Sequence, residues 1–467
     1  MAKILIAGLG KGIKRDGKYS EANYSIENEN GETIIYSGEN FITSALEKHF
    51  SIDKTIYIGT VGSMWDNLYS YYCNKYDMKE DEDYTFELLE TVSNATKDSE
   101  FSEINIEKFN SIFKGKAKII LTKFGINTNE IFENFNMIME IGNILKDGDE
   151  IFLDITHSFR SNAMWMFLVI NYIMDVLDKN IEVKMISYGM FEAKYKKEII
   201  ENGEKKKIDV SPVVNLKAFF DLMKWIKGAN ELKNYGNAYT ILEMVEDEDV
   251  NKKIRTFSNS INLNYVGTIK RNLESIKKIM EKIDLIEGPG KLIIPSILKD
   301  FIETFGKIKE EYEFLFKLAE WNFKQKRYAM VAININEGLR EFVANILEIE
   351  DRATDFNDEN SGISKYFRKV RHSIQYEKNH MKGTYDKKKE KLYKIFDHTR
   401  KIRNEIAHSA GKKDTAINDV ESLKNYVIDI NKIIKDKEFL KYLRLKYNTL
   451  DSISNPMKGV KADLIYN

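Results

Sequence analysis

The chain has 467 residues, of which 43% are hydrophobic and 31% charged, and its 72 Lys and Arg residues nearly balance 73 Asp and Glu residues. This size and composition are typical of two or three globular domains. A net charge of −1 argues against a protein that coats nucleic acid non-specifically, because such binding rests on a basic surface. One cysteine, Cys73, excludes an internal disulfide framework and a CxxC metal site and is typical of a reducing cytoplasm, where we expect the protein.

No segment of the sequence is typical of membrane insertion or secretion. No apolar run approaches the roughly 20 residues that a membrane-spanning helix needs. The N-terminal sequence MAKILIAGLG has no basic stretch followed by a long apolar core. We therefore expect neither a signal peptide nor a membrane partner.

Short apolar runs alternate with amphipathic helical patterns up to Pro212. The predicted strands are Lys3–Ala7, Thr33–Tyr36, Thr55–Ile58, Lys118–Leu121, Glu150–Asp154 and Glu182–Ser187. The predicted helices between them are Phe41–His49, Asn129–Leu145 and Arg160–Leu177. This alternation predicts an α/β domain with a mainly parallel sheet, and ligands of such sheets bind at the carboxyl ends of the strands.

From Asn215 onward helical spacing dominates, which predicts an all-α C-terminal half. Proline is scarce, so long helices are permitted, and Gly288-Pro289-Gly290 is the clearest break among them. These changes predict three domains: residues 1–212, a helical connector at 213–290, and residues 291–467. We expect the lysine runs at 194–207 and 387–391 to be a solvated loop and a solvated helix face.

Polar turns follow three of the predicted strands. The first, Gly8–Gly12, is rich in glycine, but no helix clearly follows it, so the NAD fingerprint is not met. In the second, Gly59 and Gly62 allow close approach of the backbone, while Thr60 and Ser63 can bond a phosphate or a ribose. Three such turns at the ends of strands of one sheet are stronger evidence for a ligand site than any of them alone.

The third turn joins the apolar strand around Asp154 to a long apolar helix through the sequence Thr156-His157-Ser158-Phe159-Arg160-Ser161. The free N–H groups and the dipole of a helix N-terminus attract anions. Ser158 can cap this helix, and Thr156, His157 and Arg160 add donors. An ordinary capped junction, with Asp154 and His157 satisfying each other, explains the same residues equally well.

Near the C-terminus, Arg403-Asn404-Glu405-Ile406-Ala407-His408 forms an R-x4-H motif on a predicted helix. The apolar positions of that helix are Leu392, Ile395, Phe396, Ile402 and Ile406. At about 100° per residue, Asn404 and His408 lie together on the face opposite Ile402, flanked by Arg403. A cation, an amide and an imidazole suit chemistry on a phosphate, although a solvated helix face would contain the same residues.

Other histidines and basic residues give weaker signals. Arg371 and His372 are candidates for the wall of an RNA groove, but an exposed helix face explains them as well. We expect His380 and His398 at the surface and His49 at the end of a helix.

Two resemblances to known families rest on these motifs. The R-x4-H hexapeptide, with Asn404 after the arginine, resembles the signature of HEPN ribonucleases. The sequence DITHSFRS and the stretch Gly59–Asp66 resemble the two N-terminal motifs of the DxTHG family of CRISPR-associated proteins. The stretch Asn215–Ala238, with Trp225 and Tyr235-Gly236-Asn237-Ala238, resembles the start of that family's helical half. One departure is Ser158, where many relatives have glycine.

These resemblances imply a type III CRISPR accessory ribonuclease, with a Rossmann-like CARF sensor followed by a HEPN effector. They imply a homodimer in which paired CARF domains bind a cyclic oligoadenylate made by the type III effector complex. The ligand most usual in the family is the cyclic tetra-adenylate, and the cyclic hexa-adenylate is the second candidate. The residues that we assign to this ligand are Gly8, Gly10, Lys11, Gly59, Thr60, Gly62, Ser63, Asp154, Thr156, His157, Ser158 and Arg160.

The implied reaction is attack of the RNA's own 2′-hydroxyl on the adjacent phosphate, which leaves a 2′,3′-cyclic phosphate and a 5′-hydroxyl. His408 would move protons or position the 2′-hydroxyl, Arg403 would stabilise charge on the phosphorane, and Asn404 would orient the RNA. No cluster with metal-ligand spacing accompanies the motif, so we expect no metal.

Three alternatives remain. A ligand-sensing regulator would keep the sensor and use the helical half to bind a partner without cleaving it. A metal-dependent DNase would need a carboxylate–carboxylate–Lys core, which we do not find in the helical half. The CARF domain could also degrade its own activator.

Overall fold

The computed structural model describes residues 1–15, 18–28, 30–157, 160–201, 204–281, 288–349, 362–380, 387–408, 415–441 and 443. The chain divides into two compact units, Met1–Asp221 and Leu222–Asn467. Among the described residues, no helix is both long and apolar enough to cross a membrane.

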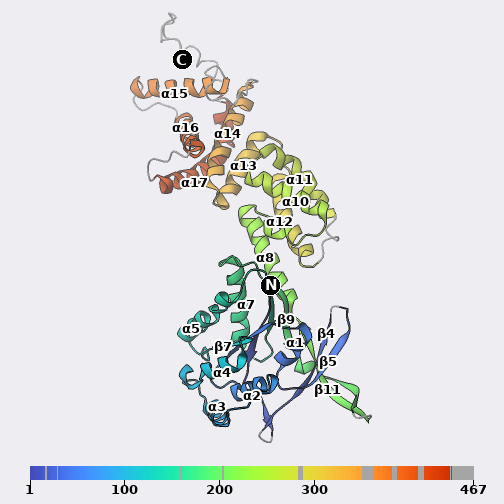
Figure 1. Ribbon diagram of the computed structural model, residues 1–467. Coiled ribbons are helices and arrows are strands. Elements are labelled where there is room, and N and C mark those ends of the chain that lie inside the picture. Colours follow the sequence, from blue (N-terminus) through green and yellow to red (C-terminus); the bar gives the residue numbers. More distant parts are fainter. Residues whose placement is uncertain are drawn as a thin grey trace, which may run out of the picture. The chain divides into compact units, whose positions relative to one another are not determined.

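The first unit is built on a mixed, mostly parallel sheet (Figure 1). Its strand order is β5-β4-β11-β9-β8-β1-β6-β7. Its parallel centre consists of β1 (Lys3–Leu9), β6 (Lys54–Gly59), β7 (Ala117–Leu121), β8 (Glu150–Asp154) and β9 (Glu182–Gly189). After β1 the chain builds β6 and β7 on one side, and then β8 and β9 on the other. The order therefore reverses between β1 and β8, where an open α/β sheet offers a crevice for ligands.

The edge of the sheet beyond β9 differs from the sequence expectation. It consists of β11 (Glu204–Asn215), antiparallel to β9, then β4 (Ala22–Glu27) and β5 (Thr33–Glu39). The prediction of a loop at 194–207 was wrong, because β10 (Tyr195–Glu201) pairs with β11 in a hairpin. Charged edge strands discourage unwanted pairing but show little apolar alternation, which hid them in the sequence. A short hairpin, β2 (Lys14–Arg15) with β3 (Lys18–Tyr19), follows β1.

Helices cover both faces of the sheet. Leu5 and Ala7 of β1 pack on one face, whereas Ile4 and Ile6 pack on the other, as expected for successive residues of a strand. The face of Leu5 is covered by α1 (Ile42–Phe50), α2 (Trp65–Lys75), α3 (Glu82–Asn94) and α4 (Ile106–Phe113). The opposite face is covered by α5 (Thr128–Met139), α6 (Ile141–Ile144) and α7 (Arg160–Asp175). The helix predicted over Asn129–Leu145 is thus interrupted at Glu140.

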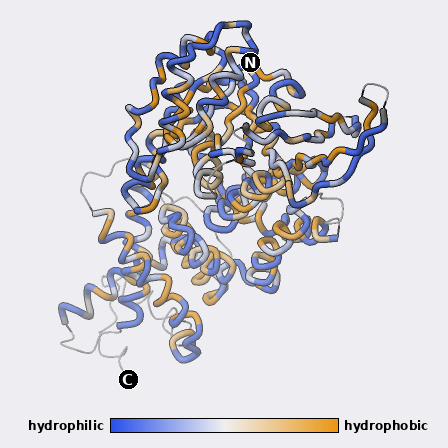
Figure 2. The backbone as a smooth tube through the Cα atoms, turned by 90° about the horizontal axis from the view of Figure 1, so that it is seen from below, coloured by the Kyte–Doolittle hydropathy of each residue, from blue (hydrophilic) through white to orange (hydrophobic). Residues whose placement is uncertain are grey.

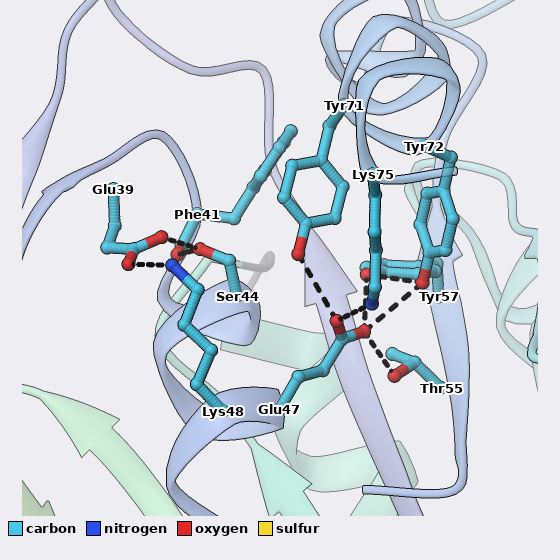
Figure 3. A network of polar contacts seen from close by, with 10 residues as sticks. All are labelled: Glu39, Phe41, Ser44, Glu47, Lys48, Thr55, Tyr57, Tyr71, Tyr72 and Lys75. Atoms are coloured by element: carbon cyan, nitrogen blue, oxygen red, sulfur yellow. Dashed lines mark hydrogen bonds and ion pairs between the residues drawn. The ribbon is translucent and has the colours of Figure 1, made fainter. Parts of the chain in front are cut away.

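A buried carboxylate fixes α1 and α2 against β6 (Figure 3). Oε1 of Glu47 accepts hydrogen bonds from Thr55 Oγ1 at 2.6 Å and Tyr72 OH at 3.1 Å. Oε2 accepts from Lys75 Nζ at 2.5 Å and Tyr71 OH at 3.3 Å. Because the donors come from β6 and α2, this network holds in place the strand that leads into the second polar turn.

The second unit is helical, and α8 (Lys217–Tyr235) leads into it from the first. Its other helices are α9 (Tyr239–Leu242), α10 (Glu248–Asn262), α11 (Val266–Glu281), α12 (Gly290–Phe305), α13 (Glu311–Lys324), α14 (Tyr328–Leu347), α15 (Gly362–His380), α16 (Lys387–His408) and α17 (Ala416–Ile433). Hydrophobic and hydrophilic residues alternate along these helices in Figure 2, as in amphipathic helices. The predicted succession of an α/β domain and an all-α half is confirmed.

Two apolar cores stabilise the helical unit. The first contains residues from Trp225 to Leu318, and the second contains residues from Phe316 to Leu443. The predicted boundary near 290 falls where α12 begins, but α12 itself packs in the first core together with α10 and α11.

Candidate functional site

The three polar turns predicted from the sequence meet around one pocket of about 1060 Å³ at the carboxyl ends of β1, β6 and β8. The predicted residues that line the pocket are Gly10, Lys11, Thr60, Gly62, Ser63, Thr156 and His157. Its position matches the reversal of strand order beside β1. A pocket of this size is typical of a site for a small molecule or a nucleotide.

Ser63 joins the first and second turns. Its Oγ donates a hydrogen bond to the carbonyl of Leu9 at 2.5 Å and accepts one from the backbone N–H of Thr60 at 3.1 Å. The backbone N–H of Met64 donates to the carbonyl of Gly10 at 2.9 Å. Ser63 is only 3% exposed, so its hydroxyl holds the pocket wall rather than reaching into the pocket.

Gly59 lies directly behind this wall and does not line the pocket. A Cβ at this position would stand 2.6 Å from Ser63 Oγ and 2.8 Å from the ring of Trp65, so a side chain here would force Ser63 or Trp65 to move. Gly8 and Asp154 do not line the pocket either. Ser158 lies outside the described residues; Arg160 begins α7, but its side chain is outside them as well.

The third turn is held by Asp154, which is fully buried. Asp154 Oδ1 accepts hydrogen bonds from Thr156 Oγ1 at 2.7 Å and Ser187 Oγ at 3.0 Å. Thr156 Oγ1 in turn accepts from the backbone N–H of Gly189 at 2.8 Å. Burial raises the pKa of Asp154 to about 6, against the effect of the hydrogen bonds from Thr156 and Ser187, which lower it. Asp154 therefore positions Thr156 at the pocket.

The alternative pairing of Asp154 with His157 is wrong. His157 Nε2 lies 3.3 Å from the hydroxyl of Tyr24, and its ring lies 5.8 Å from that of Phe191. Burial lowers the pKa of His157 to about 4. At neutral pH the ring is therefore uncharged, and because Nε2 contacts Tyr24, Nδ1 is the nitrogen that can meet a ligand.

Aromatic residues that the sequence analysis missed make up much of the remaining wall: Tyr19, Tyr24, Phe124, Tyr188 and Phe191. They come from segments far apart in the chain, two of them on β3 and β4, which no apolar pattern had revealed. Tyr19 is oriented by its hydroxyl, which donates to Asp66 Oδ1 at 2.7 Å. Flat rings of this kind can stack on nucleobases.

The charges around the pocket are mixed. Lys11, Lys97 and Lys194 line it together with Glu21 and Glu192. Lys97 pairs with Asp98 at 2.7 Å, and Lys194 lies over the ring of Phe191 at 4.8 Å from its centroid. Backbone N–H groups of the turns and Lys11 are therefore the main candidates for contacts with phosphate.

The R-x4-H motif occupies the last turns of α16, beyond the second apolar core. Leu392, Ile395 and Phe396 are buried as predicted, whereas Ile406 is 41% exposed. The core thus ends before the motif does, and Asn404 and His408 are exposed.

Arg403 is half-buried and forms an ion pair with α14. Its Nη1 lies 3.4 Å from Glu337 Oε1. The guanidinium of the motif therefore has a fixed side facing α14, next to the exposed Asn404 and His408.

The other basic and histidine residues fall in different settings. Arg371 and His372 are exposed on α15, and the side chain of His380 lies outside the described residues. His49 lies in the last turn of α1, as predicted, and its Nδ1 lies 3.2 Å from Tyr36 OH.

The expectation of a plain surface position for His398 was wrong. Its ring joins α16 to α17, with Nδ1 2.9 Å from Tyr426 OH and Nε2 3.1 Å from Asp419 Oδ1. Its side chain is 33% exposed. Cys73 is buried and free, and no group of three or more metal-binding side chains occurs in the described parts of the chain.

Comparisons with known proteins agree with this architecture. Residues 4–192 match the family model of the CARF domain of the CRISPR system endoribonuclease Csx1, and residues 221–313 match that of the second domain of CRISPR-associated protein MJ1674. The CRISPR-associated protein MJ1674 of Methanocaldococcus jannaschii is 30% identical, over 93% of this chain and 68% of that protein.

Among solved structures, Enterococcus italicus Csm6 bound to cyclic hexa-2′-fluoro-hexa-dAMP matches 97% of this chain and 100% of that one, with 10% identity and a TM-score of 0.33. At this score the likeness supports no further conclusion. The two family models and the extended similarity to the protein from M. jannaschii show that the chain belongs to the family of CRISPR-associated CARF proteins that includes MJ1674.

Proposed function

We propose that this protein is an endoribonuclease of type III CRISPR defence that is activated by a cyclic oligoadenylate and cleaves single-stranded RNA without a metal. The observation that carries the proposal is the R-x4-H turn, where Asn404 and His408 are exposed beyond the core and Arg403 is anchored beside them. The match of the first unit to the CARF domain of a CRISPR endoribonuclease supports an effector role.

The activator would bind in the pocket of the first unit. Phosphates would meet Lys11 and the backbone N–H groups of the glycine-rich turns, and adenine rings would meet the aromatic wall. The uncharged ring of His157 and the hydroxyl of Thr156 add directional hydrogen bonds. A cyclic oligoadenylate is symmetric, so a homodimer would offer it two copies of the same pocket. We favour the cyclic tetra-adenylate, with the hexa-adenylate as the alternative.

The cleavage reaction needs a nucleophile, and the 2′-hydroxyl of the RNA supplies it. Its oxygen attacks the adjacent phosphorus, the bond from phosphorus to the 5′-oxygen breaks, and a 2′,3′-cyclic phosphate and a 5′-hydroxyl result. His408 would take the proton of the 2′-hydroxyl or give one to the leaving oxygen. Arg403 would stabilise the additional negative charge on the phosphorane, and Asn404 would orient the RNA. Arg371 and His372 are weaker candidates for contacts with the RNA.

Activation follows from linkage. If the cyclic oligoadenylate binds the active arrangement of the dimer more tightly than the resting one, it shifts the population by that difference in affinity. No other input of free energy is required.

The test is cleavage of a labelled single-stranded RNA with and without cyclic oligoadenylates of different ring size. The proposal predicts cleavage that depends on one ring size. Binding of the activator without any RNA cleavage would instead identify a regulator that acts through a partner. Recovery of the activator after the assay shows whether the CARF domain also degrades it.

A further inference from the structure

Glu337 of α14 stands between two guanidinium groups. Its Oε1 lies 3.4 Å from Arg403 Nη1, and its Oε2 lies 3.8 Å from Arg340 Nε. The side chain of Arg340 is only 3% exposed, whereas those of Glu337 and Arg403 are 29% and 33% exposed. One carboxylate thus contacts both a buried cation and the arginine of the R-x4-H motif.

The seam between α14 and α16 fixes the place of this cluster. The buried Asn336 donates from Nδ2 to the carbonyl of Phe396 at 3.1 Å and to Thr399 Oγ1 at 3.3 Å. One helical turn further along each helix come Arg340 and Arg403. The buried hydrogen bonds of Asn336 therefore hold the two helices in register next to Arg340 and Arg403, and Glu337 directly follows Asn336 on α14.

The charges explain why a carboxylate is needed here. Burial lowers the pKa of Arg340; the nearby charges of Glu337 and Glu341 raise it, and that of Arg403 lowers it. Of these two carboxylates, Glu337 is the one in an ion pair with Arg403. Two cations this close repel each other, and the buried one cannot move into solvent. Without the negative charge of Glu337, Arg403 would be driven away from α14 and out of its place beside Asn404 and His408.

We infer that Glu337 is a positioning residue for the proposed RNA cleavage. It holds Arg403 through Nη1 and so fixes the guanidinium beside Asn404 and His408. It also offsets the charge of Arg340, which lies 3.8 Å from its Oε2. This inference rests on the proposed function of the R-x4-H turn.

The decisive variant is Glu337→Gln, which keeps the shape of the side chain and removes its charge. We expect kcat to fall about 10-fold to 100-fold, as misplacement of a catalytic group does, with the KM for RNA and the affinity for cyclic oligoadenylate nearly unchanged. Glu337→Asp retains the charge at a shorter reach and should recover part of kcat. The matched control is Glu341→Gln, since Glu341 lies on the same helix and is also near Arg340.

A second variant separates positioning from simple damage to the fold. If repulsion by Arg340 is what displaces Arg403, then replacing that cation in the double variant Glu337→Gln/Arg340→Met should restore activity relative to Glu337→Gln alone. A merely structural role predicts that the second substitution, at a buried position, lowers activity further. Thermal unfolding of each variant shows whether the protein is folded at the assay temperature.

The outcomes are distinct. An active wild type, an inactive Arg403→Ala variant and an unimpaired Glu337→Gln variant would overturn the inference and leave the proposed function standing. Loss of activity in Glu337→Gln without any recovery in the double variant would overturn the repulsion argument and with it the inference. A wild type that cleaves no RNA with any cyclic oligoadenylate would overturn the proposed function, and the positioning role with it.

Discussion

Thr156 Oγ1 donates a hydrogen bond to the fully buried carboxylate of Asp154 at 2.7 Å and accepts one from the backbone N–H of Gly189 at 2.8 Å. One hydroxyl thus ties the end of β8 to the end of β9 at the rim of the pocket. These two hydrogen bonds therefore hold this part of the pocket wall in place.

Replacing Thr156 by Val keeps the shape of the side chain but removes both hydrogen bonds. Since a buried carboxylate then loses a donor and a buried N–H loses its acceptor, we expect a loss of about 1–3 kcal/mol in the free energy of unfolding. Weaker activator binding should accompany it. Thr96→Val is the matched control, because Thr96 also lines the pocket without contacting a buried carboxylate. Urea unfolding of both variants measures the two losses. Equal losses of unfolding free energy in the two variants would show that Thr156 has no special structural role.

The motif residues should be separable from the fold. Asn404 and His408 are exposed and Arg403 is half-buried, so Arg403→Ala and His408→Ala should leave the melting temperature and activator binding nearly unchanged. RNA cleavage should fall by about 10²–10⁴-fold in the His408 variant, the usual range for a general acid or base. It should fall by about 10²–10³-fold in the Arg403 variant, the usual range for loss of a group that stabilises charge in the transition state. A drop of less than tenfold would place that residue outside the catalytic set.

The activator pocket gives a different signature. His157→Ala removes a hydrogen-bonding ring from the pocket, and we expect about a tenfold rise in the concentration of cyclic oligoadenylate needed for half-maximal cleavage. Arg160→Ala should act in the same direction. Saturating activator should recover most of the rate, because the R-x4-H turn is untouched. Unchanged affinity by direct titration would show that the Thr156–Arg160 turn is merely a capped junction.

Asp154 and His157, the two groups of the third turn with shifted pKa values, predict opposite dependences of stability on pH. The pKa of His157 falls from 6.5 to about 4 on folding, so the unfolded chain binds a proton more readily than the folded protein. The contribution of His157 to the free energy of unfolding is therefore complete above pH 6.5 and is lost as the pH falls toward 4. For Asp154, whose pKa rises from 3.8 to about 6, the contribution is complete below pH 3.8 and is lost as the pH rises toward 6.

NMR titration of the histidine rings checks this directly, since the chain has only six histidines and His157→Gln identifies the signal. We expect the signal of His157 to titrate near pH 4. A midpoint near 6.5 would mean that the ring is open to solvent and carries a charge on part of the molecules at neutral pH.

The sequence predicted the centre of the first unit and the turns of the pocket because buried parallel strands leave long apolar runs. It did not predict the charged hairpin of β10 and β11, or the aromatic wall, because those depend on pairing between distant segments. Thr60 and Ser63 illustrate a further limit of the sequence pattern. It showed two hydroxyls after a strand, but only the structure shows that Ser63 Oγ donates a hydrogen bond to the carbonyl of Leu9. Glu337 gave no signal at all, since its meaning comes from Arg403, on a helix more than sixty residues away.

The central claim is that the substrate's own 2′-hydroxyl is the nucleophile of an activator-dependent cleavage. The most direct measurement compares RNA with an all-2′-deoxy strand of the same sequence, in EDTA and saturating cyclic oligoadenylate, with analysis of the product ends. We predict cleavage of the RNA alone, with 2′,3′-cyclic phosphate and 5′-hydroxyl ends. Cleavage of the deoxy strand at a comparable rate, or activity that returns only when Mg²⁺ or Mn²⁺ is added back, would contradict the account.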